Sequence, residues 1–320
     1  MFSIGIDLGG TKISSAIFDH EGSVISKNLV YIENRSGGEV GSLIREQVVN
    51  LLNYSRENHF TVSGIGISVP GISYPETGRV WAPNIPGWND YPLRDDILPV
   101  IRDLRINVFI DSDRACSLLG EVWKGNARGC RDVVSLLVGT GIGAGIMVNG
   151  EIVRGSGGAA GAVGWLALDR PFREEYASCG CFEYRASGNG IAKVAREFIK
   201  RETHYHGMLR SKPVGEISAH DVFDALNEGD PLARNVMDQA IECWGMTVAN
   251  LVSLFNPEKI IFGGGIFGPA LFFLDDIYKE ALKWAQPVSI KNVTLEGSAL
   301  GSEAPLYGAA FLPLKFGAVL

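Results

Sequence analysis

The sequence predicts an α/β fold built from two related halves, and two observations support this prediction. Each half opens with short apolar runs separated by a glycine-rich turn, in the stretches 3–19 and 132–155. Helical apolar patterns follow these runs in both halves. Strands that alternate with helices indicate sheets covered by helices. The repeat lies in the order of the elements, because residue identity between the halves is weak.

Three strand-like runs open the first half, at residues 4–7, 13–18 and 24–31. The turn signals GGTK and DHEGS separate them. Residues 39–58 space their apolar side chains like an amphipathic helix. A buried strand follows and ends in Pro70-Gly71. A further strand ends at Ile110, before an acidic turn and a helix that begins near Arg114.

The second half begins with strand, glycine turn, strand, turn and strand over residues 132–155. Later expected elements are helices in 188–202 and 217–255, a strand at 259–265 and a helix near 269–285. This order suggests an N-terminal lobe over residues 1–117 and a C-terminal lobe over residues 118–304. We expect a C-terminal helix at 305–320 to pack back on the first lobe.

The size and composition of the chain are those of a folded enzyme. Its 320 residues suffice for two domains or one large one, and 46% of them are hydrophobic. The net charge of −7 argues against nucleic acid as a partner, because a polyanion needs a basic face. Neither a signal peptide nor an apolar run of about 18 residues is present. We therefore expect a cytoplasmic protein without a membrane partner, whose five cysteines are reduced.

Three glycine-rich turns follow predicted strands, at DLGGT (7–11), GTGIGAG (139–145) and FGGGIFG (262–268). Backbone N–H groups without neighbouring side chains can approach an anion closely, and a helix N-terminus adds further donors. Three such turns in two similar halves suit a nucleotide. None matches the Walker or the dinucleotide-binding pattern. For any single turn, hairpin geometry alone is the alternative explanation.

Six stretches in the same order resemble the ROK family of sugar kinases and repressors. They are DLGGTK (7–12), SVPGISYPETGRVWAPNIPGW (68–88), DRACSLLGE (113–121), GTGIGAG (139–145), NPEKIIFGGG (256–265) and ALGSEAPLYGAA (299–310). The resemblance implies the two-lobed actin-like, hexokinase-like ATPase fold with ribonuclease H-like halves. It also implies ATP, Mg²⁺, a sugar substrate and a homodimer. Repressors of this family carry an N-terminal helix-turn-helix, whereas this chain enters its first strand at residue 3, so we expect a kinase.

The resemblance assigns the reacting groups. Asp113 matches the catalytic aspartate, which takes the proton of the attacked hydroxyl. From the local pattern alone, Asp111 competes for this role, and a helix N-cap is the alternative role for Asp113. Asp7 is expected to orient Mg²⁺ through water. Residues expected at the nucleotide are Gly9, Gly10, Thr11, Lys12, Thr140, Gly141, Gly264 and Gly265. ATP as the donor follows from the resemblance, and the sequence alone leaves polyphosphate open.

Relatives hold the sugar with five polar groups, of which three differ here. Asn84 in NIPGW and Glu183 in CGCFEYRASG keep their match. Ser112 stands in place of an asparagine. In GAVGW, Ala162 and Trp165 stand in place of a glutamate and a histidine. We therefore expect a sugar kinase with an altered sugar pocket. The alternative is a catalytically weak regulatory protein that binds a sugar or nucleotide on the same scaffold.

The same changes affect the zinc site of the relatives, which uses one histidine and three cysteines. Trp165 occupies the histidine position, and the cysteine run shortens to Cys179-Gly180-Cys181. Two thiolates do not complete the tetrahedral site that structural zinc prefers. No structural zinc is expected.

Overall fold

The computed structural model describes residues 1–102, 104 and 106–317, and it divides the chain into two compact units. The first unit consists of Met1–Gly129, Ile152–Ala160 and the chain from Ser298 on; the second consists of Cys130–Glu151 and Gly161–Gly297. The chain therefore passes between the units four times. The expected lobe boundary at residue 117 falls inside helix α3 (Asp113–Lys124), which belongs to the first unit.

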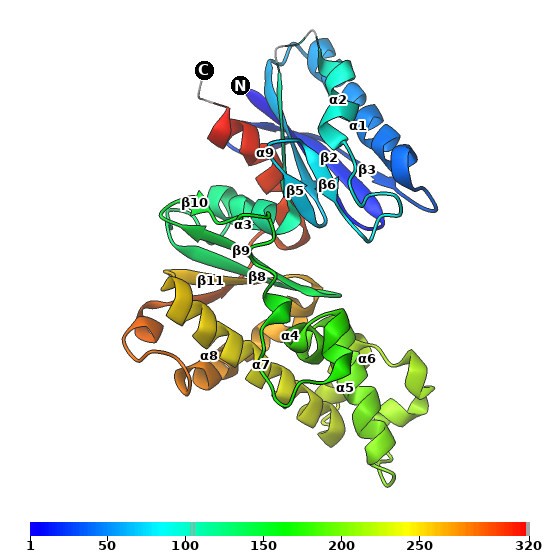
Figure 1. The fold of residues 1–320 in the computed structure, drawn as a ribbon, viewed down its shortest axis with the longest axis vertical. Coiled ribbons are helices and arrows are strands. Elements are labelled where there is room, and N and C mark those ends of the chain that lie inside the picture. Colours follow the sequence, from blue (N-terminus) through cyan, green and yellow to red (C-terminus); the bar gives the residue numbers. More distant parts are fainter. Residues whose placement is uncertain (103, 105, 318–320) are drawn as a thin grey trace. The chain divides into compact units, whose positions relative to one another are not determined.

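The first unit is built on a five-stranded sheet of order β3-β2-β1-β4-β7; Figure 1 labels its strands β2 and β3. Its strands are β1 (Phe2–Leu8), β2 (Lys12–Asp19), β3 (Val24–Tyr31), β4 (Val62–Val69) and β7 (Asn107–Ser112). Strand β1 pairs antiparallel with β2 and parallel with β4, and β4 pairs parallel with β7. The C-terminal ends of β1, β3, β4 and β7 therefore lie at one edge of the sheet, together with the β1–β2 turn.

Helices cover both faces of this sheet. Helices α1 (Gly37–Glu57) and α2 (Leu93–Ile101) share one apolar core with the strands. Helix α9 (Ala304–Phe316) packs on β1 and β4 from the other face and contacts α3. Glycines allow this close approach, because a Cβ on Gly66 would lie 1.8 Å from the Ala309 carbonyl oxygen. Residues 318–320 of the expected C-terminal helix lie outside the described residues.

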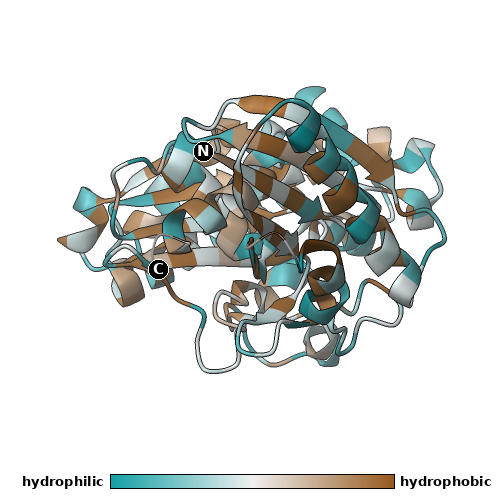
Figure 2. Cartoon of the chain, turned by 90° about the horizontal axis from the view of Figure 1, so that it is seen from above, coloured by the Kyte–Doolittle hydropathy of each residue, from teal (hydrophilic) through white to brown (hydrophobic). Residues whose placement is uncertain are grey.

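A short hairpin of β5 (Ile72–Tyr74) and β6 (Arg79–Trp81) lies between β4 and α2 in the chain. In Figure 2 the strands of the sheets are mostly hydrophobic, as the buried faces of the core require. Within the part of the chain that the structure describes, no helix is long and apolar enough to cross a bilayer.

The second unit repeats the plan of the first. Its sheet has the order β10-β9-β8-β11-β12. The strands are β8 (Val133–Val138), β9 (Ile142–Val148), β10 (Glu151–Ile152), β11 (Lys259–Gly263) and β12 (Thr294–Gly297). Strand β8 pairs antiparallel with β9 and parallel with β11, as β1 does with β2 and β4. The predicted repeat in element order is confirmed.

The helices of the second unit are α4 (Cys181–Ala186), α5 (Gly188–Arg201), α6 (Ala219–Asn227), α7 (Pro231–Phe255) and α8 (Leu274–Leu282). The prediction of continuous helix over 217–255 is wrong at one point. Gly229 adopts a φ of +80°, and the Asp230 side chain caps the N-terminus of α7. The break therefore comes from a left-handed glycine followed by a strong N-cap.

Candidate active site

The turn between β1 and β2 holds the first group of predicted nucleotide residues. The Gly9 amide donates to the Lys12 carbonyl oxygen at 2.9 Å, which closes the turn. Gly10, Thr11 and Lys12 are exposed. A Cβ on Gly10 would have one neighbour within 4 Å, the Asn84 Nδ2 at 3.5 Å, and the backbone there is not left-handed. Neither turn geometry nor packing requires glycine at position 10, so ligand access is the better explanation for it.

Asp7 lies next to this turn, near the end of β1, and is half-buried. Ser68 on β4 donates its hydroxyl to Asp7 Oδ1 at 2.8 Å. Burial, together with the negative charges of Asp113 and Glu303, raises the pKa of Asp7 to about 7, although the Ser68 hydrogen bond and the Lys12 charge act in the opposite direction. A bound divalent cation would favour the ionised form of such a carboxylate. The residues present therefore fit Mg²⁺, with Asp7 as the group that holds it.

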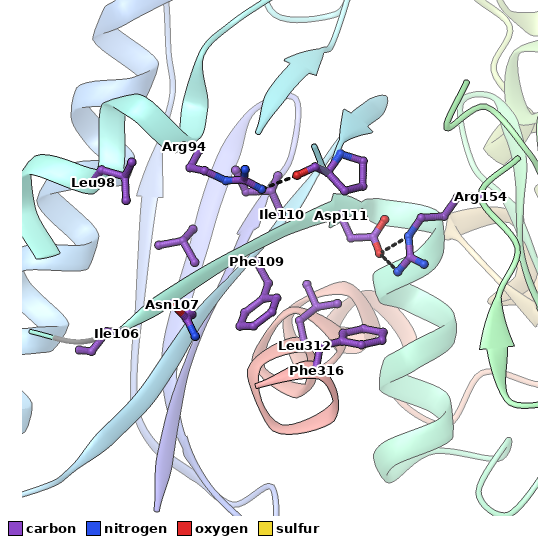
Figure 3. A pocket seen from close by; sticks show the side chains of 12 residues that line it. Arg94, Leu98, Ile106, Asn107, Phe109, Ile110, Asp111, Arg154, Leu312 and Phe316 are labelled. Carbon is purple, nitrogen blue, oxygen red and sulfur yellow. Dashed lines mark hydrogen bonds and ion pairs between the residues drawn. The ribbon is translucent and has the colours of Figure 1, made fainter. Parts of the chain in front are cut away.

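Two carboxylates follow one another at the end of β7, and their surroundings differ. Asp111 is buried and accepts two hydrogen bonds from Arg154, from Nη2 at 2.6 Å and from Nε at 3.1 Å. It lines a cavity of about 640 Å³ along β7, together with Arg154 and Phe316 (Figure 3). Asp113 does not line that cavity. Asp111 is therefore committed to an ion pair within the first unit.

Asp113 is the first residue of α3 and is half-buried. It accepts the adjacent Arg114 amide at 2.8 Å, and among the described residues it makes no ion pair within 4 Å. Burial raises its pKa, and the nearby Arg114 charge opposes this shift. The helix N-cap is Ser112, whose hydroxyl accepts the Ala115 amide at 3.3 Å. The N-cap role left open for Asp113 thus belongs to its neighbour.

Asn84 lies in the loop 82–88, beside Gly10. Its side chain is exposed and has no hydrogen-bond partner among the described residues. The loop itself is well fixed, because Trp88 is fully buried and stacks on Tyr91 with ring centroids 4.2 Å apart. The Ala82 amide also donates to the Trp88 carbonyl oxygen at 2.8 Å. A fixed loop with an unused amide suits a polar ligand.

In the second unit, the turn between β8 and β9 carries Thr140 and Gly141. Glu183 on α4 accepts the Ile142 amide at 2.7 Å through Oε2. A Cβ on Gly141 would lie 2.7 Å from the same oxygen. The structure therefore brings together a residue predicted for the sugar and a turn predicted for phosphate. Glu183 is half-buried, and burial raises its pKa.

The GAVGW segment forms a short 3₁₀ turn, Val163–Trp165, that follows Ala162. The Trp165 side chain is 58% exposed. Gly180 packs tightly against this turn with a φ of +87°, since a Cβ there would lie 2.5 Å from the Trp165 Cα. Cys181 is buried beside Tyr176 and Tyr184. Within the described ranges, no three histidine, cysteine, aspartate or glutamate residues are grouped as metal ligands.

The third glycine turn follows β11. Gly264 has a φ of +86°, and a Cβ there would lie 2.4 Å from the Val138 carbonyl oxygen. Gly265 has open space where a Cβ would stand. Packing and backbone conformation thus require glycine at 264, while position 265 is open for a ligand.

Sequence reasoning missed two residues beside Asp7. Ser68 is a buried hydroxyl near the C-terminal end of β4, after the apolar run 64–67, and this contrast could have marked it. Glu303 precedes α9, pairs with Lys27 and acts on Asp7 through its charge. Its ion pair with Lys27 of β3 joins residues about 280 positions apart in the sequence, so no local pattern reveals it.

Comparison with known proteins shows to which protein family the chain belongs. Residues 3–315 match the ROK family. The chain belongs to the ROK family. A glucokinase of Halalkalibacterium halodurans is 31% identical over 319 residues, covering 97% of this chain and 94% of that protein.

Solved structures of ROK proteins support the fold. The ROK hexokinase of Thermus thermophilus superimposes with a TM-score of 0.80 at 29% identity, covering 98% of this chain and 99% of that one. A ROK glucokinase of Streptomyces griseus, in complex with glucose and AMPPNP, gives 0.76 at 27% identity with the same coverage. The predicted actin-like ATPase fold is confirmed.

Proposed function

We propose that this ROK protein is a sugar kinase that transfers the γ-phosphoryl group of ATP to a hydroxyl of a sugar or sugar derivative, with Mg²⁺. The observation that carries the proposal is the contrast at the end of β7. Asp111 is engaged by Arg154, whereas Asp113 has no ion partner among the residues that the structure describes, and its pKa is raised. The likeness to a glucokinase and to a hexokinase supports phosphoryl transfer to a sugar. The AMPPNP in the Streptomyces griseus complex supports ATP as the donor.

Each residue has a defined task in this proposal. Asp113 takes the proton of the attacking hydroxyl, which needs an unpaired carboxylate of suitable pKa. Asp7 holds the hydrated Mg²⁺, and Ser68 orients the Asp7 carboxylate. When bound, Mg²⁺ neutralises charge on the phosphates. The remaining proposed nucleotide residues are Gly9, Gly10, Thr11 and Lys12 in the first unit, and Thr140, Gly141, Gly264 and Gly265 in the second.

The proposed sugar residues favour an acceptor other than free glucose. Ser112 uses its hydroxyl to cap α3, and Ala162 offers no polar group. Trp165 presents an exposed aromatic face, which stacks on the C–H side of a sugar ring or an apolar group. Each hydroxyl of glucose left without a partner costs on the order of 1 kcal/mol. Asn84 and Glu183 remain as polar contacts.

The test is an assay of ADP release with ATP and a panel of hexoses, amino sugars and polyols. Turnover that Asp113→Asn abolishes supports the kinase. Nucleotide binding without turnover on any acceptor favours the second candidate, a weakly active regulatory protein, which the three altered sugar positions suggest. Replacing ATP by polyphosphate in the same assay tests the donor.

We also propose a cytoplasmic homodimer that acts on small molecules. This rests on the family relationship, and on a net charge of −7 that disfavours nucleic acid. Light scattering on the purified protein measures the oligomeric state. A monomer at micromolar concentration would contradict the homodimer.

A further inference from the structure

A recess of about 200 Å³ adjoins two of the proposed ligand-binding residues of the first unit. Gly10 of the β1–β2 turn and Asn84 both line it. One wall is the segment 32–36, which connects β3 to α1, and the other is the segment 84–86. The recess therefore continues from two residues that the proposed function already uses to the segment 32–36, to which that function assigns no ligand.

The two walls hold each other in place. The Gly37 amide donates to the Pro86 carbonyl oxygen at 2.8 Å, and the Trp88 indole donates to the Gly37 carbonyl oxygen at 3.0 Å. Arg35 Nη1 donates to the carbonyl oxygens of Tyr31 and Ile32, both at 3.3 Å. These bonds fix the shape of the recess before any ligand arrives, as is usual for small-molecule sites.

The lining mixes polar and apolar groups and is close to neutral, with Ile32, Ile85 and Pro86 beside the polar side chains. The Arg35 guanidinium pairs with the Glu33 carboxylate at 3.1 Å. The positive end of α1 is occupied by Glu39, which accepts the Ser36 amide at 3.2 Å. A phosphate or carboxylate would find the Arg35 charge already paired with Glu33, and a wholly apolar group would leave the Asn34 and Asn84 amides without hydrogen-bond partners. Hydroxyl groups both donate and accept, so they match a lining in which amides, a hydroxyl, a guanidinium and a carboxylate mix.

The sheet places the recess away from the proposed base. Asp113 follows β7, whereas the recess lies at the β1–β2 turn and the end of β3, two to four strands away in the sheet. With strands about 4.8 Å apart, this separation is roughly 10–19 Å. One pyranose ring with its reacting hydroxyl at Asp113 is too narrow to fill the recess as well. A second group attached to that ring, beyond Asn84, reaches it.

We propose that the recess is a subsite for a glycosyl substituent, so that the preferred acceptor is a disaccharide or other glycoside rather than a free hexose. The inference rests on the proposed kinase function. Asn84 then contacts the reacting ring on one side and the glycosyl substituent on the other. The subsite supplies hydrogen bonds that the altered sugar positions no longer offer.

Asn34→Trp tests the subsite, because Asn34 lines the recess, is exposed and has no hydrogen-bond partner among the described residues. An indole there fills the recess without entering the core. Asn34→Ala is the gentler variant, which leaves the space open and removes the amide. Asn89→Trp is the matched control, since Asn89 is exposed, follows the same loop and does not line the recess.

The assay compares glucose with cellobiose and maltose, and N-acetylglucosamine with chitobiose, by ADP release. We expect at least one disaccharide to exceed its parent monosaccharide about tenfold in kcat/KM. Asn34→Trp should abolish the advantage of the disaccharide and leave kcat/KM for the monosaccharide within about twofold of the parent value. Asn34→Ala should reduce the disaccharide advantage in part. Asn89→Trp should change kcat/KM for neither acceptor. The inference is overturned when every disaccharide has a lower kcat/KM than its parent monosaccharide. It is also overturned when Asn34→Trp lowers kcat/KM for the disaccharide and for the monosaccharide by the same factor.

A failure of the kinase proposal is distinguishable from a failure of the subsite. If no ADP is released with either the monosaccharides or the disaccharides, the proposed kinase activity fails. Titration calorimetry with cellobiose, maltose and chitobiose then tests the subsite by itself. Binding that Asn34→Trp abolishes and Asn89→Trp preserves supports it. The absence of binding, or binding that is indifferent to Asn34→Trp, overturns it.

Discussion

The two units share one strand order, yet their equivalent hairpins carry different chemistry. Asp7 pairs with Ser14 one step before the end of the first hairpin, and Leu137 pairs with Gly143 at the equivalent step of the second. The acid of the first hairpin thus has an apolar residue as its counterpart. The comparison teaches that the two units share a strand order, while the charged groups that we propose for phosphoryl transfer, Asp7 and Asp113, lie in one of them.

Particular glycines of the two units also differ in the reason why glycine occupies the position. Position 10 in the first unit has open space for a side chain, whereas Gly161 and Gly264 in the second have left-handed backbones. A Cβ on Gly161 would lie 1.9 Å from the Ala144 carbonyl oxygen. Glycine in the first turn leaves room for a ligand, and glycine at these two positions of the second unit permits packing.

The largest expected effect comes from Gly10→Val. The added side chain fills space that the phosphates need, and the nearest protein atom to its Cβ is 3.5 Å away, so the fold survives. We expect ATP affinity to fall at least about 100-fold, a loss of about 2.7 kcal/mol, with a circular dichroism spectrum like that of the parent. Unchanged ATP affinity in the folded variant would show that the turn is merely a hairpin.

Gly264→Ala is the contrasting variant in the second unit. Its left-handed backbone and the contact with Val138 make any side chain strained, at a cost of about 1–3 kcal/mol. We expect a lower melting temperature. If the variant were as stable as the parent, packing would not require glycine at position 264, and the contrast with Gly10 would be wrong.

The next effect is that of Asp113→Asn, which should reduce turnover about 100-fold or more and leave nucleotide affinity nearly unchanged. The folded-state pKa of Asp113 is raised by burial, so its ionised form costs stability once the pH exceeds that pKa. Asn carries no such cost. The variant should therefore melt at a higher temperature than the parent at pH 8, and the gain should vanish near pH 3, below the unfolded pKa.

Asp111→Asn is the matched control on the same strand. It removes the charge that holds Arg154 and should cost about 1.5–3 kcal/mol of stability. Turnover of the folded fraction should fall far less than in Asp113→Asn. Retention of most of the kcat by Asp113→Asn, measured on a verified acceptor, would remove that residue from the role of base.

Local patterns predicted much of this structure, and long-range packing supplied the rest. Alternating apolar runs and turn signals located β1, β2, β3 and the glycine turns, because those signals are local. Helix α2 escaped prediction, since it is short and contains Pro99. Arg154 returns from a later segment to pair with Asp111. The recess beside Asn84 forms from two loops about 50 residues apart in sequence, joined by the bonds of Gly37.

Some features of the candidate site were likewise predicted from the sequence, and others became visible only in the structure. The resemblance to the ROK family named Asp113, but only the structure shows that Ser112 caps the helix and that Arg154 pairs with Asp111. The roles of the nucleotide and sugar residues stay predictions until the variants are measured.

The smallest expected effect concerns the sugar positions, where the combined variant Ser112→Asn, Ala162→Glu and Trp165→His restores the groups found in relatives. Asn is as good an N-cap as Ser, so α3 should keep its start, and Trp165 is 58% exposed, so its loss costs little packing. We expect glucose kcat/KM to rise about tenfold, the effect of about 1.4 kcal/mol of regained hydrogen bonding. Efficient glucose phosphorylation by the unmodified protein, with a KM below about 1 mM, would contradict the altered pocket. It would mean that Asn84, Glu183 and backbone groups suffice to hold the sugar.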